Sequence, residues 1–494
     1  MNDRLQKLIE ARGPIRKVGV IGMGYVGIPS AVLFADCPTI DIVYGFQRDS
    51  PSSGHKIAML NRGESPLKGE EPGLEPLIKK VVSAGKFRCT PDYSLISELD
   101  AVTLAIQTPF KDPKDLVPDF GPLVEGLNMA GRYIRPGALV VLESTITPGT
   151  TAGMAREVLE KASGMKAGED FALAHAPERV MVGRLLRNIQ EHDRIVGGID
   201  AASTKRACDL YAPILTKGRI IPMTATAAEV TKTAENTFRD LQIAAANELA
   251  LYCEAMGINF YSVRTGIDSL KGEGITRAIL YPGAGVGGHC LTKDTYHLER
   301  GVRILNGRLD YPEGEKSIFV LARNVNDFMP RHMYNLTLSA LARAGRSIKG
   351  ANVTVLGWAF LGNSDDARNT PSEIYYDLLV KAGASPTVHD CYVDRYPGVD
   401  IRHDLDAALL GADAVAVMTG HDRYRSLDAA RVKELSGRAH PAIIDGRNVI
   451  DPEAFIRQGF VYSGIGRGDR NSHPIVTPEP EGHATQEVHT AQHA

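Results

Sequence analysis

Residues 17–28, KVGVIGMGYVGI, decide the fold of the first part of the chain. An apolar run ends there in Gly22, Gly24 and Gly27, spaced as GxGxxG, and a helical stretch follows. Glycines at this spacing permit a tight turn between a strand and a helix, and they let the backbone approach a pyrophosphate at the helix N-terminus. A second β-branched run at 41–47 completes the order strand, helix, strand. The stretch therefore predicts a dinucleotide-binding unit, with a tight turn that holds no ligand as the alternative.

Gln47 and Arg48 end the second predicted strand, where an acidic residue normally accepts hydrogen bonds from the ribose hydroxyls of NAD. A carboxylate there would repel a 2′-phosphate, whereas Arg48 could attract one. Two interpretations stay open: use of NADP, or NAD held by Gln47 with Arg48 stacked on the adenine. The expected cofactor contacts are Gly22, Gly24, Tyr25, Val26, Gly27, Gln47, Arg48, Thr108 and Thr145.

Alternating β-branched runs and helical stretches extend outward from this unit to about residue 215, and they reappear after Pro330. Between them, residues 227–256 form one predicted alanine-rich helix of about 45 Å, closed by Gly257. We expect an α/β fold with two Rossmann-like, doubly wound parallel sheets, joined by this long central helix and a helical domain. The helix is also the expected contact of a homodimer, with a higher oligomer left open.

The predicted domain boundaries follow from these patterns. We expect a cofactor domain at 1–215, a central helical domain with a glycine-rich cysteine loop at 216–329, and a second Rossmann-like domain at 330–468. Residues 469–494 lack apolar periodicity and are predicted to be a disordered tail.

Composition narrows the class of protein further. A net charge of −3 over 494 residues excludes a broadly basic nucleic-acid binder. Six cysteines without a CxxC pair predict neither a zinc site nor a disulfide framework, so we expect no metal and a cytoplasmic location. The uncharged run 18–35 is long enough to span a membrane, but its glycines and Pro29 favour a strand, a turn and a helix. We therefore expect no membrane contact.

A second glycine-rich loop, at 283–288, delivers Cys290 to the start of a predicted helix. A helix N-terminus favours thiolate over thiol, as does the nearby Lys293, and Asp294 lies one turn further along the same face. We interpret Cys290 as a nucleophile, with a buried cysteine in a tight turn as the alternative.

Three polar side chains share one face of the long helix. Lys232, Asn236 and Arg239 are spaced four and three residues apart. A solvated polar stripe, which is common on helices, is the other interpretation of this spacing.

Five further blocks, together with the fingerprint, make residues 16–465 resemble the UDP-glucose/GDP-mannose dehydrogenase family of nucleotide-sugar 6-dehydrogenases. The blocks are ESTITPG at 143–149, HAPER at 175–179, KTAENTFRD at 232–240, GGHCLTKD at 287–294 and GWAFLGNSDDARNTP at 357–371. The GVGGHC form is similar to the branch that oxidises N-acetylhexosamine sugars, such as UDP-N-acetylmannosamine or UDP-N-acetylglucosamine.

The resemblance implies that the C6 alcohol of a UDP-sugar is oxidised to a carboxylate in two NAD-dependent steps, giving a uronic acid for polysaccharide biosynthesis. Cys290 would carry a thiohemiacetal and then a thioester, and Lys232 with Asn236 would stabilise the first alkoxide. Water near Asp294 and Lys232 would hydrolyse the thioester. By the same resemblance, Thr145 helps to hold that water, Glu178 is an acidic residue of the site, and the second sheet binds the UDP part. The implied substrate contacts are Glu178, Arg179, Lys232, Asn236, Arg239, Gly287 and Arg368.

One departure from the family concerns the base of the first step. Some members carry another glutamate four residues after the position of Glu178, and this chain has Val182 there. Lys232, Asp294 or water is left to act as the base. The alternative functions are a UDP-glucose or GDP-mannose 6-dehydrogenase, a two-electron hydroxy-acid dehydrogenase, and a nucleotide-sugar sensor without activity.

Overall fold

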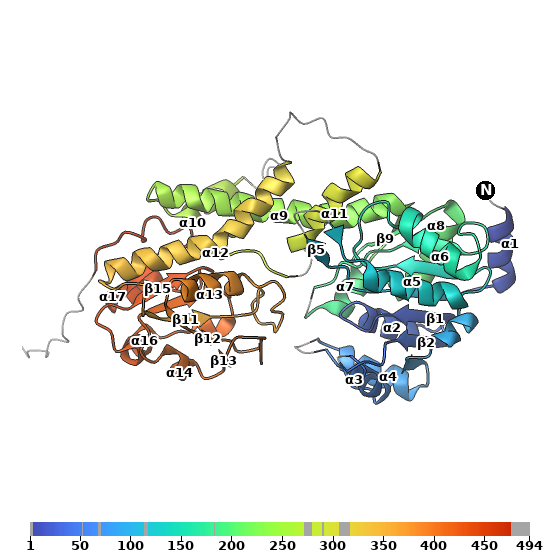
Figure 1. Cartoon of the computed structure of the whole chain (residues 1–494), viewed down its shortest axis with the longest axis horizontal. Helices are drawn as coiled ribbons and strands as arrows, with labels where there is room; N and C mark the ends of the chain where they lie inside the picture. Colours follow the sequence, from blue (N-terminus) through green and yellow to red (C-terminus); the bar gives the residue numbers. More distant parts are fainter. Residues whose placement is uncertain are drawn as a thin grey trace, which may run out of the picture. The chain divides into compact units, whose positions relative to one another are not determined.

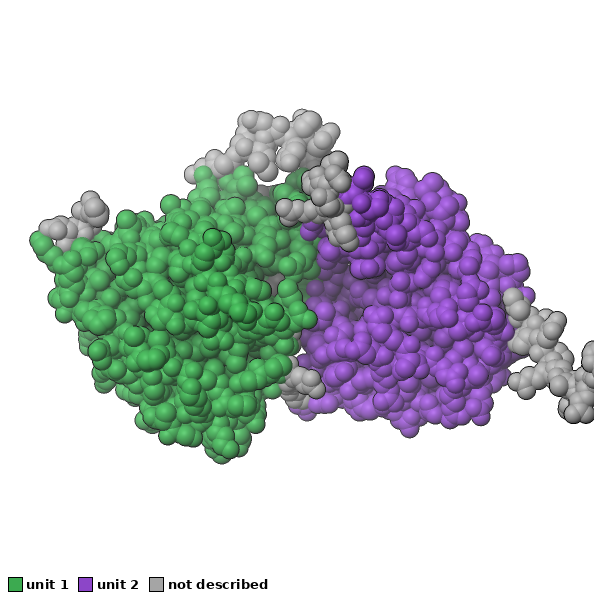
Figure 2. Space-filling model, turned by 180° about the vertical axis from the view of Figure 1, so that it is seen from behind, with its two compact units in different colours: residues 1–241, 288–324 green, residues 242–287, 325–494 purple. Residues whose placement is uncertain are grey.

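The computed structural model describes residues 3–51, 53–67, 71–112, 117–181, 183–270, 279–288, 291–305 and 317–475. The chain forms two compact units, one of residues 1–241 with 288–324 and one of residues 242–287 with 325–494 (Figure 2). The region 216–329, expected as one helical domain, is therefore divided between them. Val182 and Cys290 lie outside the described residues.

The first unit is built on an eight-stranded sheet in the order β10-β9-β8-β7-β4-β1-β2-β3. Neighbouring strands pair in parallel, as predicted, except β8 with β9, so β9 and β10 run against the other six. Antiparallel neighbours can be joined without a crossover that returns the chain to the end at which the first strand began. The connection between β8 and β9 is accordingly a loop with one short helix. The strands are β1 (Lys17–Ile21), β2 (Ile42–Phe46), β3 (Phe87–Thr90), β4 (Ala101–Leu104), β7 (Leu139–Leu142), β8 (Ala172–His175), β9 (Arg194–Gly198) and β10 (Ile220–Thr224).

The central strands of this sheet point alternately into two apolar cores, one on each face. In β7, Leu139 and Val141 belong to one core, and Val140 and Leu142 to the other. Helices cover both faces (Figure 1), which explains why the strands are apolar throughout. The helices are α1 (Asp3–Arg12), α2 (Gly27–Asp36), α3 (His55–Asn61), α4 (Leu74–Ser83), α5 (Gly121–Tyr133), α6 (Arg156–Ser163), α7 (Leu185–Glu191) and α8 (Ala201–Tyr211).

Shorter elements complete the first unit. A small antiparallel ribbon precedes α5, and a π-helical turn leads into α6. These elements are β5 (Phe110–Asp112), β6 (Val117–Pro118), η1 (Tyr93–Glu98), η2 (Thr151–Ala155) and η3 (Ala212–Ile214). The uncharged run at 18–35 forms β1, the glycine turn and most of α2, as predicted. Among the described residues, no helix combines the length and the apolar character needed to cross a membrane.

The second unit contains a six-stranded, wholly parallel sheet in the order β13-β12-β11-β14-β15-β16. The strand order reverses between β11 and β14, so a crevice is expected at their carboxyl ends. The strands are β11 (Asn352–Leu356), β12 (Ser385–His389), β13 (Ile401–Arg402), β14 (Ala414–Val417), β15 (Ala442–Asp445) and β16 (Val461–Gly464). The helices are α10 (Phe260–Asp268), α13 (Pro371–Lys381), α14 (Leu405–Leu409), α15 (Asp422–Arg425), α16 (Ala429–Ser436) and α17 (Pro452–Arg457).

The long central helix is present as α9 (Ala225–Ala255), and its first 17 residues belong to the first unit. Two other helices lie near the expected boundaries: α11 (Leu291–Ile304), in the first unit, and α12 (Ile318–Arg343), which runs through Pro330. The tail was expected to begin at residue 469. Instead, the Arg343 guanidinium donates hydrogen bonds to the carbonyls of Asn471 (2.5 Å) and His473 (2.7 Å). Residues 476–494 lie outside the described part of the chain.

Candidate active site

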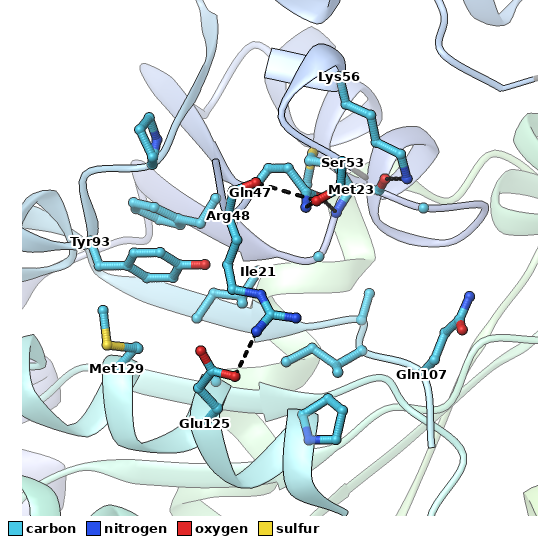
Figure 3. A pocket seen from close by; sticks show the side chains of 18 of the residues that line it. Ile21, Met23, Gln47, Arg48, Ser53, Lys56, Tyr93, Gln107, Glu125 and Met129 are labelled. Atoms are coloured by element: carbon cyan, nitrogen blue, oxygen red, sulfur yellow. Dashed lines mark hydrogen bonds and ion pairs between the residues drawn. The ribbon is translucent and has the colours of Figure 1, made fainter. Parts of the chain in front are cut away.

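A cavity of about 700 Å³ opens at the carboxyl ends of β1, β2 and β4 in the first unit (Figure 3). It includes four of the predicted cofactor contacts, Gly22, Gly24, Gln47 and Arg48. Tyr93 and Met129 line one side of it, and Gln107 lies on the opposite side (Figure 3). The cavity has the position at which Rossmann sheets bind the adenosine half of a dinucleotide.

Each of the three glycines of the fingerprint is needed for a different structural reason. Gly22 has a φ of 101°, which L side chains rarely adopt, and Gly27 lies so close to the turn that a Cβ would stand 1.9 Å from the carbonyl oxygen of Gly22. Gly24 is different, because nothing lies within 4 Å of the place a Cβ would take. The open space at Gly24 fits a pyrophosphate approaching the backbone, so the turn has the form that a dinucleotide needs.

Gln47 occupies the end of β2 and is held at both ends of its carboxamide. Its Oε1 accepts a hydrogen bond from the Met23 amide (3.2 Å), and its Nε2 donates to Ser53 Oγ (3.0 Å). Lys56 reaches the same turn and donates to the Met23 carbonyl (3.0 Å); burial lowers the pKa of Lys56. The place of the usual carboxylate is thus neutral, with an ammonium beside it (Figure 3).

Arg48 projects across the cavity and forms an ion pair with Glu125 of α5, at 2.8 Å (Figure 3). Both side chains are more than half exposed, so this pair is weak in water. Tyr25 and Val26 form the turn before α2, and like Gly27 they are not among the lining residues of the cavity.

Thr108 and Thr145 connect the ends of β4 and β7. The buried Thr108 hydroxyl donates to the carbonyl of Thr145 at 2.5 Å. The two predicted contacts are therefore neighbours, and Gln107 and Pro109 on either side of Thr108 line the cavity.

Glu178 lies after the end of β8, where a buried arginine neutralises it. Arg194 forms ion pairs with Glu178 and, at 3.2 Å, with Glu143, and Tyr211 donates to Glu143 at 2.7 Å. Burial raises the pKa of Glu143. Sequence reasoning missed Arg194 and Glu143; a charged residue at the start or end of an otherwise apolar strand was the available signal.

Lys232, Asn236 and Asp294 are all buried in the first unit. The Asn236 amide donates to Asp294 Oδ2 at 2.5 Å, which joins α9 to α11 as the proposed roles require. Lys232 forms no hydrogen bond or ion pair with another described residue. Its cation and that of Arg194 act on His175: burial first, and then these charges, lower the pKa of His175 to about 3. A buried ammonium without an internal partner is suited to an oxygen that becomes negative during a reaction.

Two predicted substrate contacts in the same unit are placed differently. Arg239 is exposed, although spacing puts it on the face of Lys232. Arg179 is half-buried and engaged, because it forms an ion pair with Glu235 of α9 (3.5 Å) and donates to the carbonyl of Asp193.

Gly287 and Arg368 belong to the second unit. A Cβ on Gly287 would stand 2.5 Å from the Cβ of Phe360, so this glycine is required by packing inside the unit. Arg368 is paired with Asp366 through two hydrogen bonds, at 2.8 and 2.5 Å. Gly283 and Gly285 also face protein atoms, those of Arg447 and of two prolines. Gly283, Gly285 and Gly287 are therefore each required by close packing, and Gly287 stays a predicted substrate contact.

The start of the loop that follows β11 is anchored at the crevice of the second sheet. Asp390 accepts hydrogen bonds from the amides of Trp358 (2.6 Å) and Ala359 (3.0 Å), and it pairs with His421 at 3.1 Å. Burial alone would raise the pKa of Asp390, but His421 and the amides of Val393 and Tyr392, which donate to its other oxygen, lower it to about 2. Asp390 thus shapes the loop that carries Arg368.

Comparison with known proteins matches all three parts of the chain to one family. Models of the UDP-glucose/GDP-mannose dehydrogenase family match as follows: the NAD binding domain at residues 16–215, the central domain at 226–315 and the UDP binding domain at 354–452.

Individual relatives agree with these matches. The UDP-N-acetyl-D-mannosamine dehydrogenase of Pyrococcus horikoshii is 34% identical over 454 residues, covering 92% of this chain and 100% of the relative. The crystal structure of an NDP-N-acetyl-D-galactosaminuronic acid dehydrogenase from Methanosarcina mazei Go1 is 71% identical, with a TM-score of 0.87 over 95% of this chain and 99% of that one. A Ralstonia nicotianae protein with the same name is 31% identical over 429 residues, covering 85% of this chain and 94% of the relative.

Proposed function

Because the chain belongs to the UDP-glucose/GDP-mannose dehydrogenase family of NAD-dependent nucleotide-sugar dehydrogenases, we propose that it oxidises the C6 alcohol of a UDP-N-acetylhexosamine to the uronate. The observation that carries the proposal is the buried, unpaired Lys232 beside Asn236 and Asp294, in the unit that also contains the dinucleotide cavity. The proposal includes a cytoplasmic enzyme whose product serves polysaccharide biosynthesis.

The first step converts the alcohol to an aldehyde. NAD supplies a two-electron acceptor at C4 of its nicotinamide, and the chain must remove the hydroxyl proton. Lys232 and Asn236 lie one helical turn apart and would stabilise the alkoxide oxygen as it becomes negative. Arg194 neutralises Glu178 through an ion pair, which leaves water or Asp294 to take the hydroxyl proton.

The second step uses Cys290 as a nucleophile. Its thiolate would add to the aldehyde carbon, and the oxygen would take up a proton to give a thiohemiacetal. The thiohemiacetal would pass a hydride to a second NAD and its hydroxyl proton to water, and so become a thioester. Water then adds to the thioester carbonyl, releasing the uronate and the thiol. Asp294 would hold that water, because Asn236 and Lys293 fix both of its carboxylate oxygens.

Two sugars have specific support among the relatives. N-acetylmannosamine is named in the P. horikoshii relative, and N-acetylgalactosaminuronic acid in the 71% identical M. mazei structure. We therefore expect turnover with one of UDP-N-acetylmannosamine, UDP-N-acetylgalactosamine or UDP-N-acetylglucosamine.

A substrate panel tests the proposal directly. Each UDP- and GDP-sugar is incubated with NAD and, separately, with NADP, and reduced cofactor is followed by absorbance. The expected result is two moles of reduced cofactor per mole of one N-acetylated UDP-sugar. A stoichiometry of one, or unchanged turnover in Cys290→Ala, would contradict the mechanism. Lys232→Met should lower kcat by about a thousandfold while NAD binding is kept. The matched control is Lys205→Met, which changes an exposed lysine of α8.

We also propose that the protein is a homodimer joined through α9. The exposed apolar side chains Phe238 and Tyr252 on this helix support the assignment.

A further inference from the structure

Three stretches of the first unit carry the proposed catalytic groups. They are the segment after β7 with Thr145, the first half of α9 with Lys232 and Asn236, and α11 with Asp294. α11 is separated from the rest of the unit by more than forty residues of sequence. Its position against the other two stretches must therefore be set by side-chain contacts.

Glu229 joins the first two stretches. This side chain is fully buried on α9, one turn before Lys232, and it accepts three hydrogen bonds from the segment after β7. The donors are the Gly149 amide (2.6 Å), the Thr151 amide (2.8 Å) and the Thr151 hydroxyl (2.6 Å). The carboxylate thus closes the start of the π-helical turn, whose first amides have no helical partner.

His297 joins the segment after β7 to α11. It is fully buried, with its Nδ1 2.9 Å from Thr147 Oγ1 and its Nε2 3.5 Å from Lys293 Nζ. Phe110 and Phe120 contact its ring, at centroid distances of 4.5 and 6.1 Å. The ammonium of Lys293 can only donate, so Nε2 accepts and Nδ1 carries the proton that is donated to Thr147.

The remaining contacts connect α11 back to α9 and complete a closed network of contacts, the circuit. Lys293 Nζ lies 3.4 Å from Asp294 Oδ1, and Asn236 on α9 donates to Asp294 Oδ2 at 2.5 Å. Starting from Glu229, the path runs through the segment 147–151 to His297, along α11 to Asp294, and back to α9. Apolar packing supports it, since a Cβ on Gly301 of α11 would stand 2.8 Å from the ring of Pro148.

We propose that Glu229 and His297 are positioning residues of the dehydrogenase reaction. Neither touches the reacting atoms; together they fix the segment after β7, α9 and α11 so that Lys232, Asn236 and Asp294 meet the same sugar carbon. The inference rests on the proposed function, because it concerns the same site.

We expect loss of these contacts to lower kcat more than it weakens the binding of NAD or of the sugar nucleotide. A displacement of about 1 Å between groups that act together can cost about a hundredfold in rate. Most residues that line the cofactor cavity lie in or next to β1, β2, β4 and α5, and Glu229, Thr147 and His297 are not among them. Loss of the circuit should therefore lower kcat by about tenfold to a hundredfold and leave the Kd for NAD and the KM for the sugar nucleotide within about twofold.

Substitutions at His297 separate its two contacts. Asn places an amide near the position of Nδ1 and can keep the contact with Thr147, whereas Gln reaches the position of Nε2 and can keep the contact with Lys293. His297→Phe keeps an aromatic ring and loses both. We expect kcat to be lowest in His297→Phe and partly restored in His297→Asn and His297→Gln.

Thr147 and Glu229 provide variants that do not alter the imidazole. Thr147→Val removes the hydroxyl at constant shape and should lower kcat, while Thr147→Ser should restore it. The double variant Thr147→Val/His297→Phe should be no slower than His297→Phe alone, because both changes break the same contact. Glu229→Gln should lower kcat in the same range, since an amide cannot accept from all three donors.

The outcomes discriminate between the inference and the proposed function. If the wild-type enzyme oxidises no nucleotide sugar, the proposed function fails. If it turns over and His297→Phe or Thr147→Val keeps the wild-type kcat, the positioning role is overturned. Multiplicative losses in the double variant, or a rise in KM in place of the fall in kcat, overturn it as well.

Discussion

At the residue scale, glycine recurs in this chain for several distinct structural reasons. Gly22 supplies a left-handed φ, Gly27 and Gly287 supply room for neighbouring protein atoms, and Gly24 leaves open space beside the cofactor cavity. Only the last of these reasons concerns a ligand. An excess of glycine therefore marks close backbone approach in general, and the approaching group is identified only in three dimensions.

Alanine substitutions at Gly24 and at Gly27 should affect different properties, NAD binding in the first case and stability in the second. In Gly24→Ala the methyl group fills open space, so we expect a Tm within about 1 °C of wild type and a Kd for NAD at least about tenfold higher. In Gly27→Ala the Cβ meets the Gly22 carbonyl at 1.9 Å, and we expect a loss of about 2 kcal/mol in the free energy of unfolding. Calorimetric titration and thermal unfolding measure the two effects. Tight NAD binding by Gly24→Ala would contradict the assignment of the cavity.

A carboxylate at position 47 should make the enzyme more selective against NADP. Gln47 is neutral and lies near Lys56 at the end of β2, so the wild type lacks the charge that repels a 2′-phosphate. In Gln47→Asp we expect the ratio of the Kd for NADP to that for NAD to rise by about tenfold or more. Gln47→Asn, of equal size and without charge, is the control. An unchanged ratio in the aspartate variant would place the ribose elsewhere.

At the scale of elements, the strands and the fingerprint could be predicted because their signals are local. β1, β2, β4, β7 and β8 fall inside the apolar runs of the sequence, and α9 begins two residues before its predicted start. The antiparallel pairing of β9 carried no local signal, since an apolar strand has the same pattern in either direction.

The site was predictable to the extent that its residues occur in blocks of known spacing. Lys232 and Asn236 were predicted from one helical face, and Asp294 from its place one turn after Cys290 on the next predicted helix; the Asn236 amide donates to Asp294. Arg239 shows the limit of this reasoning, because periodicity gives the face of a helix and not what covers that face at each turn. The contacts of Arg194 with Glu143, and those of Glu229 and His297 with the segment after β7, each span more than forty residues of sequence, and these partners are defined only by the fold.

The contact between α9 and the segment after β7 should depend on pH. Burial raises the pKa of Glu229 from its ordinary value of 4.5 to about 7, so folding favours the protonated carboxyl. Its contribution to stability is full below pH 4.5 and is lost as the pH rises through 7, a change of about 3 kcal/mol. Urea unfolding at pH 5 and pH 8 measures it as the difference between wild type and Glu229→Gln. A difference that stays constant between the two pH values would show that Glu229 titrates normally.

At the scale of the whole molecule, the chain enters each of its two compact units twice. Residues 242–287 leave the first unit and residues 288–324 return to it, so each unit is assembled from two separate stretches. The glycine-rich loop at 283–288 lies at one of these crossings, and Gly283, Gly285 and Gly287 pack against other residues of the second unit, to which they belong. These compact units therefore differ from domains drawn as continuous stretches of sequence, because contiguity in sequence and in space differ here.

The proposed dimer makes a prediction about the exposed side of α9. Phe238, in the part of α9 that belongs to the first unit, is 57% exposed, and Tyr252, in the part that belongs to the second unit, is 60% exposed. An exposed aromatic side chain on a helix suits a symmetric contact, in which each helix covers the aromatic group of the other. We expect the wild type to have the mass of a dimer by light scattering, and Phe238→Glu to shift it towards the monomer because a charge would be buried without a partner. Leu410→Glu changes another exposed apolar residue, at the end of α14, and should leave the dimer intact. A dimer that persists in Phe238→Glu would exclude this face of α9 as the interface.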